Sequence, residues 1–278
     1  LSAKKRPRLS KKQLVYAALL ALLCFAVGFG VGRCAALLPS PPKAVSFSEP
    51  LIEAAVRLQL GVGNDAKLKE EDLLRVKEVY IFGNEVFKNR DSFDGVGPED
   101  SVRGGIKSLD DIRLLPNLEI LDIAHQGEMD ISGLKYAANL NHISLSHMRI
   151  SDCSVLAELK SLRIINIFDT DISDFSVLAA CERLENISIG QCPIRSVEQI
   201  GEYPWLKSLS LNCLKMDNLD GLEAMPRLKE VFLEHSEIED YSALRKLRYL
   251  ETVYASEDNF AQIEEALAGS GVEVSVQN

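Results

Sequence analysis

One leucine returns every 22 residues along about half of the chain. The positions in this register are Leu118, Leu140, Leu162, Leu184, Leu206, Leu228 and Leu250. Each is followed by apolar residues three and five positions later, as in Leu121 and Ile123. This alternation is typical of a short strand that buries one face. Further apolar residues at offsets 10, 13 and 16, such as Ile172, Phe175 and Leu178, predict a return segment on the convex side.

This periodicity predicts a leucine-rich repeat solenoid. The pattern L-x-x-L-x-L at a period between about 20 and 29 residues is the signature of that architecture. A single repeat cannot bury its own apolar face, so the core forms only where repeats stack. The expected fold class is α/β: 22-residue repeats with a parallel concave sheet and a helical N-terminal cap, preceded by one transmembrane helix.

Both ends of the repeat region carry patterns that predict caps. Residues 51–60 form an amphipathic pattern that predicts a short helix, and Gly61 ends it. Residues 260–267 predict another helix, and alternating valines over 272–276 predict an edge strand. Terminal elements of this kind shield the open ends of a solenoid core.

The first repeat is interrupted by an insertion. Apolar residues over 76–81 predict an irregular strand, and Asn84 and Val86 continue the repeat pattern. The second half of this repeat, residues 106–115, then arrives about twenty residues late. The excess, near 87–105, is polar and contains glycines. Insertions in repeat proteins map to loops on one face, often the binding face, and a tolerated flexible loop is the alternative.

The N-terminal region predicts a membrane anchor. Six basic residues precede Leu14–Gly32, a run without charge that as a helix spans about 28 Å, close to the hydrocarbon thickness of a bilayer. This charge distribution favours a cytoplasmic N-terminus. A cleaved signal peptide is the alternative, disfavoured by the length of the run and by Arg33 beside Cys34. Gly28 and Gly32 would allow two such helices to pack as a homodimer, although glycine is also common in spanning helices.

These patterns divide the chain into consecutive segments. The expected boundaries are 1–13 for a basic cytoplasmic segment, 14–38 for the transmembrane helix, 39–50 for a proline-rich linker, 51–75 for the helical N-cap, 76–117 for the irregular first repeat with its insertion, 118–257 for the leucine-rich repeats and 258–278 for the C-terminal cap.

Charge and cysteine usage narrow the partners. The whole chain carries −10, and residues 1–43 contribute eight positive charges, so residues 44–278 carry −18. This charge argues against nucleic acid as a partner of the folded part. The six cysteines show no disulfide framework. Cys192 and Cys213 lie in adjacent repeats, but their columns differ by one residue; we expect them to point apart, with a disulfide as the alternative.

Several segments resemble the internalin-type bacterial leucine-rich repeat proteins. The sequence Ile-Ser-Asp-Cys-Ser-Val-Leu at 150–156 has counterparts at 172–178 and 238–244, and its Asp and Ser side chains can cap the convex turn. Residues 47–57, followed by 71–74, are similar to the helical N-terminal cap of the same group. The resemblance covers roughly residues 47–278 and implies the fold more specifically than the function.

The chain departs from this resemblance at offset eight, where the family usually has asparagine. Only Asn84 matches. The other residues in that column are Gln126, Met148, Thr170, Cys192, Leu214, Ser236 and Asp258. We therefore expect turns less regular than those of the consensus.

No sequence motif points to catalysis. The chain has no phosphate-binding loop, zinc-protease motif, paired C-x-x-C or nucleophile elbow, so we expect neither enzymatic activity nor a cofactor. His125, His147 and Asp169 share offset seven in consecutive repeats. They favour a solvated polar ladder with no metal, and a zinc site is the alternative.

Strand positions at offsets two, four and six are expected to line an exposed concave face. The candidate partner-binding residues are Ile120, His142, Ile164, Asn166, Phe168, Asn186, Ser208, Asn212, Glu230, Phe232 and Tyr254. Phe168, Phe232 and Tyr254 are the expected anchors, because aromatic residues often dominate interfaces. The alternative is ordinary sheet surface, where single apolar residues need no explanation.

The sequence as a whole predicts a single-pass cell-membrane protein with a cytoplasmic N-terminus. Its extracytoplasmic repeats would bind a protein or peptide at the cell surface without catalysis. One alternative is the sensor ectodomain of a larger signalling protein, such as a receptor-like kinase whose cytoplasmic domain precedes Leu1. An anchored structural protein of the cell wall is another.

Overall fold

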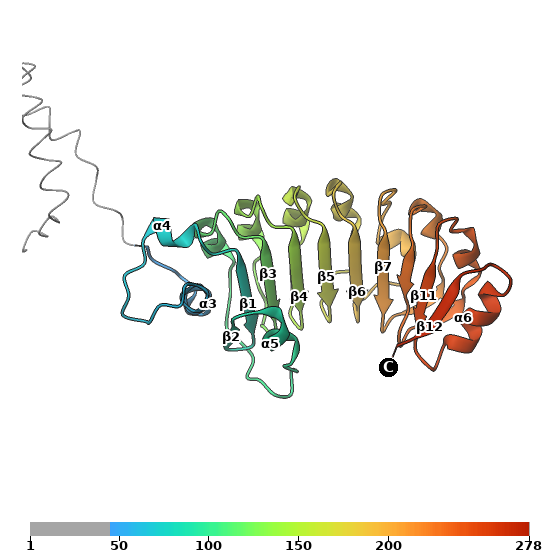
Figure 1. Ribbon diagram of the computed structural model, residues 1–278, viewed down its shortest axis with the longest axis horizontal. Coiled ribbons are helices and arrows are strands. Elements are labelled where there is room, and N and C mark those ends of the chain that lie inside the picture. Colours follow the sequence, from blue (N-terminus) through green and yellow to red (C-terminus); the bar gives the residue numbers. More distant parts are fainter. Residues whose placement is uncertain (1–44, 278) are drawn as a thin grey trace, which may run out of the picture. The chain divides into compact units, whose positions relative to one another are not determined.

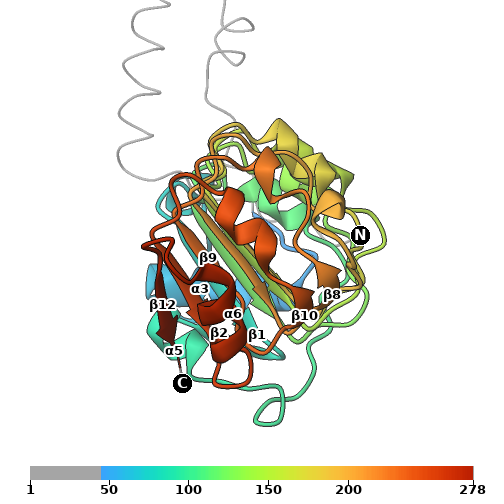
Figure 2. The same cartoon turned by 90° about the vertical axis from the view of Figure 1, so that its right-hand side faces the viewer.

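Each repeat folds into a strand, a turn and a return segment, and the repeats stack side by side (Figure 1). The computed structural model describes residues 45–277. In these residues a ten-stranded sheet has the order β12-β11-β9-β7-β6-β5-β4-β3-β1-β2. Seen along the stack, this sheet lies on one side and the return segments lie on the other (Figure 2). The predicted leucine-rich repeat solenoid with its long parallel sheet is confirmed.

The sheet pairs one repeat with the next without a register shift. Its strands are β1 (Glu78–Phe82), β2 (Glu85–Phe87), β3 (Ile120–Ala124), β4 (His142–Ser146), β5 (Ile164–Phe168), β6 (Asn186–Gly190), β7 (Ser208–Asn212), β9 (Glu230–Phe232), β11 (Thr252–Ala255) and β12 (Glu273–Val276). The return segments contain the 3₁₀ helices η2 (Asp110–Leu114), η3 (Ser132–Tyr136), η4 (Ser154–Glu158), η5 (Ser176–Ala180), η6 (Val197–Gln199), η7 (Leu222–Ala224) and η8 (Ser242–Lys246). Parallel pairing in register aligns Leu121 with Ile143 and Ile143 with Ile165, so identical columns contact each other along the stack.

The periodic apolar residues form one continuous core. Leu118, Leu140 and Leu162 are completely buried, and the same column ends at Leu250, which remains 7% exposed near the C-terminal cap. The convex turns begin as the sequence suggested, since Asp152 accepts a hydrogen bond from the backbone N–H two residues later. Hydrogen bonding to Ser154 lowers the pKa of the Asp152 carboxyl.

The turns after the strands share one conformation, and the expectation of irregular turns is wrong. At offset seven the backbone adopts positive φ in every repeat from His125 (53°) to His235 (55°). At offset eight, other side chains make hydrogen bonds with the backbone groups of the turn that asparagine would satisfy. Gln126 donates to the carbonyls of Gly83 and Ala124, and Ser236 Oγ accepts from the N–H of Leu214. A buried polar backbone group needs a partner, and several side chains can supply it.

Two cysteines at neighbouring turns do not form a bridge. Within residues 45–277 the cysteines are free, Cys192 and Cys213 among them. The Cys192 thiol lies 3.4 Å from Thr170 Oγ1 and 3.3 Å from the carbonyl oxygen of Gly190. Burial raises its pKa. Cys192 therefore belongs to the packing of the turn column.

The N-terminal cap is joined to the first repeat by one buried carboxylate. Helix α3 (Pro50–Leu60) ends at Gly61, whose φ is 68°, and α4 (Glu70–Leu73) follows. Asp111 in η2 is completely buried and accepts hydrogen bonds from Ser48 N, Ser48 Oγ and Glu49 N at 2.7, 2.9 and 2.8 Å. Glu49 in turn accepts from the backbone N–H of Lys107. The entry to α3 is thus tied to residues about sixty positions later.

The insertion begins with a hairpin rather than a continued repeat. β2 pairs antiparallel with β1, so the prediction that the repeat pattern continues is wrong at Val86. Gly83 takes a φ of 57° there, which favours the tight reversal into β2. Helix α5 (Arg90–Asp94) follows and places the inserted segment against the first strands (Figure 1).

The C-terminal end is closed by helix α6 (Phe260–Leu267) and by β12, which pairs in parallel with β11 at the edge of the sheet. Beside the turns, β8 (Lys215–Asn218) and β10 (Glu237–Asp240) form a separate two-stranded parallel sheet. The bounds of α6 equal those expected from the sequence pattern.

The expected transmembrane helix at 14–38 and its Gly28 and Gly32 face lie outside the described residues. Among the helices of residues 45–277, none combines the length and the apolar character that a membrane span requires.

Replacing Asp111 with alanine should lower the free energy of unfolding by about 2–4 kcal/mol, because the completely buried carboxylate accepts three hydrogen bonds from Ser48 and Glu49 that would all be lost. Urea denaturation of the purified protein measures this change. Asp110→Ala, at an exposed neighbouring position, is the matched control and should have little effect. Equal losses in both variants would contradict the role of Asp111.

Candidate functional site

The concave face of the sheet is the candidate site, and the insertion covers its N-terminal end. Phe93 of α5 packs on the strand residues Tyr80 and Phe82, with ring centroids 6.2 and 5.7 Å apart. Ala124 is completely buried in this cluster, and Ile120 packs against it. Ile120 was predicted to contact a partner; here it is partly buried against this cluster, to which the insertion contributes Phe93.

A charged cluster fixes the insertion to the sheet. Asp122 on β3 is completely buried, and its Oδ2 lies 2.6 Å from Nη2 of Arg90. His142 Nε2 lies 3.3 Å from the other oxygen of Asp122 and 2.5 Å from Arg90 Nη2. The prediction that His142 is exposed is therefore wrong, since only 8% of it is accessible. No sequence pattern pairs Arg90 with Asp122, because the two residues lie 32 positions apart in unrelated segments.

The middle of the concave face is open and carries one aromatic anchor. Ile164, Asn166 and Phe168 are half-buried, and Asn186 is exposed. The Phe168 ring lies over Gly190 on the next strand, where a Cβ would come within 2.5 Å of its Cδ2. Gly190 thus lets the ring lie across the sheet. Phe168 is half-buried, so part of its ring is accessible to a partner.

The C-terminal part of the face combines stacked aromatics with acidic side chains. Phe232 and Tyr254 occupy paired positions on β9 and β11, and their rings stack with centroids 4.2 Å apart and planes 16° apart. Glu230 is half-buried on the same strand as Phe232. Asn212 accepts a hydrogen bond from Glu234 N.

One residue of this region is less accessible than predicted. Ser208 is buried, with 7% exposed, so the expectation that it lines an open surface is wrong. It pairs with Asn186 on one side and Glu230 on the other. Its short side chain lies between these longer neighbours.

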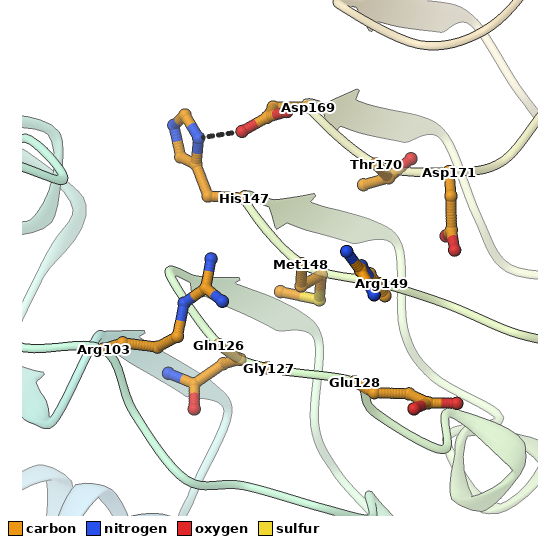
Figure 3. A pocket seen from close by; sticks show the side chains of 10 residues that line it. All are labelled: Arg103, Gln126, Gly127, Glu128, His147, Met148, Arg149, Asp169, Thr170 and Asp171. Carbon is orange, nitrogen blue, oxygen red and sulfur yellow. Dashed lines mark hydrogen bonds and ion pairs between the residues drawn. The ribbon is translucent and has the colours of Figure 1, made fainter.

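A polar cavity of about 520 Å³ lies at the turn edge of the first repeats (Figure 3). Its lining residues are Arg103, Gln126, Gly127, Glu128, His147, Met148, Arg149, Asp169, Thr170 and Asp171. Arg103 comes from the insertion, so the cavity joins the insertion to the regular repeats. Its side chains carry both signs of charge, which suits hydrogen bonding to a polar group.

The predicted polar ladder is only partly continuous. His147 Nδ1 lies 2.8 Å from Asp169 Oδ2 (Figure 3), whereas His125 Nδ1 lies 3.0 Å from Ser101 Oγ of the insertion. Burial lowers the pKa of His125, and electrostatic repulsion from Arg103 and His147 lowers it further. Within residues 45–277, no group of three or more His, Cys, Asp or Glu side chains is placed to hold a metal ion.

Comparisons with known proteins define the fold class. No protein-family model matches the chain, and no curated protein matches it in sequence. Among solved structures, internalin C2 from Listeria monocytogenes is similar over 76% of this chain and 94% of its own, at 20% identity and a TM-score of 0.56. Internalin F from the same organism is similar over 84% of this chain and 71% of its own, at 18% identity and a TM-score of 0.56. The protein thus has an internalin-like leucine-rich repeat fold.

Removing Arg90 should destabilise the protein by about 2–3 kcal/mol, because Asp122 would remain buried without its counter-charge. This figure is below that for a fully buried pair because Arg90 is 36% exposed. Urea denaturation compares Arg90→Ala with Arg227→Ala, which removes an exposed arginine elsewhere and should have little effect. The single variants Arg90→Ala and Asp122→Asn and their combination form a double-mutant cycle. Additive losses in that cycle would contradict a direct ion pair.

Proposed function

We propose that this chain is a membrane-anchored, extracytoplasmic binding module that recognises a protein or peptide on its concave face, without catalysis. The observation that carries the proposal is the open part of the sheet from β5 to β11. There Phe168 and the Phe232–Tyr254 pair lie half-buried among small polar residues. Aromatic side chains held in place by neighbours give up little conformational freedom on binding, so they suit an interface.

The insertion supports the same surface. It covers the first strands and is held by Arg90, so the accessible face begins beside it, near β5. A partner approaching this face would meet the insertion at one end and the stacked aromatics at the other. The likeness to internalins supports a solenoid whose sheet is available for binding.

The anchor and the orientation rest on the N-terminal sequence. The charge-free run Leu14–Gly32 has the length of a bilayer span, and the basic residues before it favour a cytoplasmic N-terminus. The repeats would then face away from the cytoplasm. A non-catalytic role is supported by the absence of catalytic motifs from the sequence.

Replacing Phe168 and Phe232 together with alanine should weaken partner capture at least about thirtyfold, which corresponds to roughly 2 kcal/mol from two anchor residues. A photo-crosslinking residue at Ser188, on the concave strand β6, reports capture on cells, and one at Glu158 in η4 reports the convex side. The double variant Tyr136→Ala with Tyr249→Ala removes two exposed aromatics outside the strands and should leave capture unchanged. Capture from Glu158 but not from Ser188 would refute concave-face binding.

The native protein should remain in membranes after carbonate washing, and protease added to intact cells should degrade its repeats. An antibody against residues 44–278 detects the protein in both experiments. The same antibody gives the mass of the native protein. A band near 30.7 kDa favours the display module, and a much heavier band favours the sensor ectodomain. Leu20→Arg together with Leu23→Arg should release the protein from membranes, since each charge costs about 2.5–3.5 kcal/mol at the centre of a span. Extraction of the unaltered protein by carbonate would refute the anchor.

A further inference from the structure

The concave face holds a second buried carboxylate, Glu234, whose charge has no counterpart among residues 45–277. Only 9% of Glu234 is exposed, and its Oε2 is inaccessible to solvent and has no hydrogen-bond partner in the described part of the chain. No lysine, arginine or histidine side chain of residues 45–277 forms an ion pair with it. A buried carboxylate without a partner is unfavourable, so a cationic group from a binding partner would be stabilised beside Glu234.

The surroundings of Glu234 suit a flat cation. Glu230 and Phe232 lie on the same concave side of β9, because they stand two residues apart in that strand. Glu234 follows in the turn directly after β9. Phe232 stacks on Tyr254 of the next repeat, so a carboxylate precedes and follows the stacked Phe232 at a spacing of two residues. Asn212 holds the backbone at Glu234 through its side-chain oxygen, 3.2 Å from Glu234 N. Aromatic faces attract cations, and the attraction strengthens when a nearby carboxylate adds its charge.

The same face contains an internal example of this arrangement. Asp122 is also buried on the concave side, and there the insertion delivers Arg90 to it at 2.6 Å. Tyr80 on the neighbouring strand is the register partner of Asp122, and its ring contacts Phe93 of the insertion. In the first repeats an arginine that reaches over the sheet therefore pairs with Oδ2 of a buried carboxylate, while Oδ1 of Asp122 has no hydrogen-bond partner among the described residues. At Glu234 the described residues supply no such arginine.

We propose that Glu234, together with Glu230 and the Phe232–Tyr254 pair, binds an arginine side chain of the protein partner. This inference rests on the proposed function, because it names the chemistry of what the concave face recognises. Arginine fits better than lysine, since its planar guanidinium can stack on an aromatic ring while donating several hydrogen bonds to carboxylates. The charge of −18 on residues 44–278 also favours approach of a basic segment.

The test uses the full chain and two pentapeptide probes, Gly-Gly-Arg-Gly-Gly and Gly-Gly-Lys-Gly-Gly, both blocked at their ends. Fluorine NMR of 3-fluorotyrosine at Tyr254, assigned with Tyr254→Phe, follows each titration. We expect saturable binding of the arginine peptide and weaker binding of the lysine peptide. Glu234→Gln should weaken the arginine peptide about tenfold, equivalent to 1.4 kcal/mol.

The matched control is Glu239→Gln, which removes the same charge from an exposed position on β10 and should leave the affinity unchanged. Phe232→Leu should weaken arginine binding and abolish the preference over lysine, because the stacking surface is lost. Equal effects of Glu234→Gln and Glu239→Gln, or no saturable binding, would overturn the proposal.

The stability of Glu234→Gln separates recognition from a structural role. Removal of an unpartnered buried charge should leave the melting temperature unchanged or raise it. A clear fall would show that Glu234 already has an internal partner and would also overturn the proposal.

Failure of this inference is distinguishable from failure of the proposed function. If Phe168→Ala with Phe232→Ala abolishes partner capture while Glu234→Gln leaves it intact, the concave face binds its partner without arginine recognition, and only the inference falls. If the photo-crosslinking residue at position 188 captures no partner, the proposed function is refuted, whether or not the peptides bind.

Discussion

The stacking of identical apolar columns is the constraint on which the rest of this structure depends. The inward residues of one strand, such as Leu121 and Ile123, contact their counterparts in the next repeat because the parallel pairing never slips. A slip of one residue would exchange core and surface along an entire strand. The strict period therefore fixes both the core and the set of side chains that remain on the concave face.

Stacking also buries backbone N–H and C=O groups at the same positions in every repeat, and these groups need hydrogen-bond partners. Each turn leaves backbone groups inside the structure, and the chain satisfies them with chemically different side chains, from Gln126 to Ser236. The first repeat has no predecessor to pack on, so the α3 cap covers it and Asp111 secures the junction. Conformation is conserved at these positions although residue type is not, because any suitable donor or acceptor meets the need.

The concave face then divides according to how each buried charge is satisfied. Near β3, Arg90 neutralises Asp122 and fastens the insertion, which removes that end from any partner's reach. Directly after β9, Glu234 follows the stacked Phe232 by two residues and receives no such residue from residues 45–277. One surface thus contains a self-occupied region and an open one with similar chemistry, and this contrast connects the fold to the proposed recognition.

The sequence by itself determined the repeat register, the core columns and the helices α3 and α6, because these depend on short-range periodicity and on local signals such as Gly61. It also identified the concave positions, including Phe168, Phe232 and Tyr254. Only the tertiary structure decided which of them are accessible. His142 is covered because a segment 52 residues earlier returns over the sheet, and His125 bonds to Ser101 of that insertion rather than to the ladder. Contacts between segments without a shared period leave no pattern in the sequence, so burial, ion pairs and the solitary charge of Glu234 emerge only when the chain is folded.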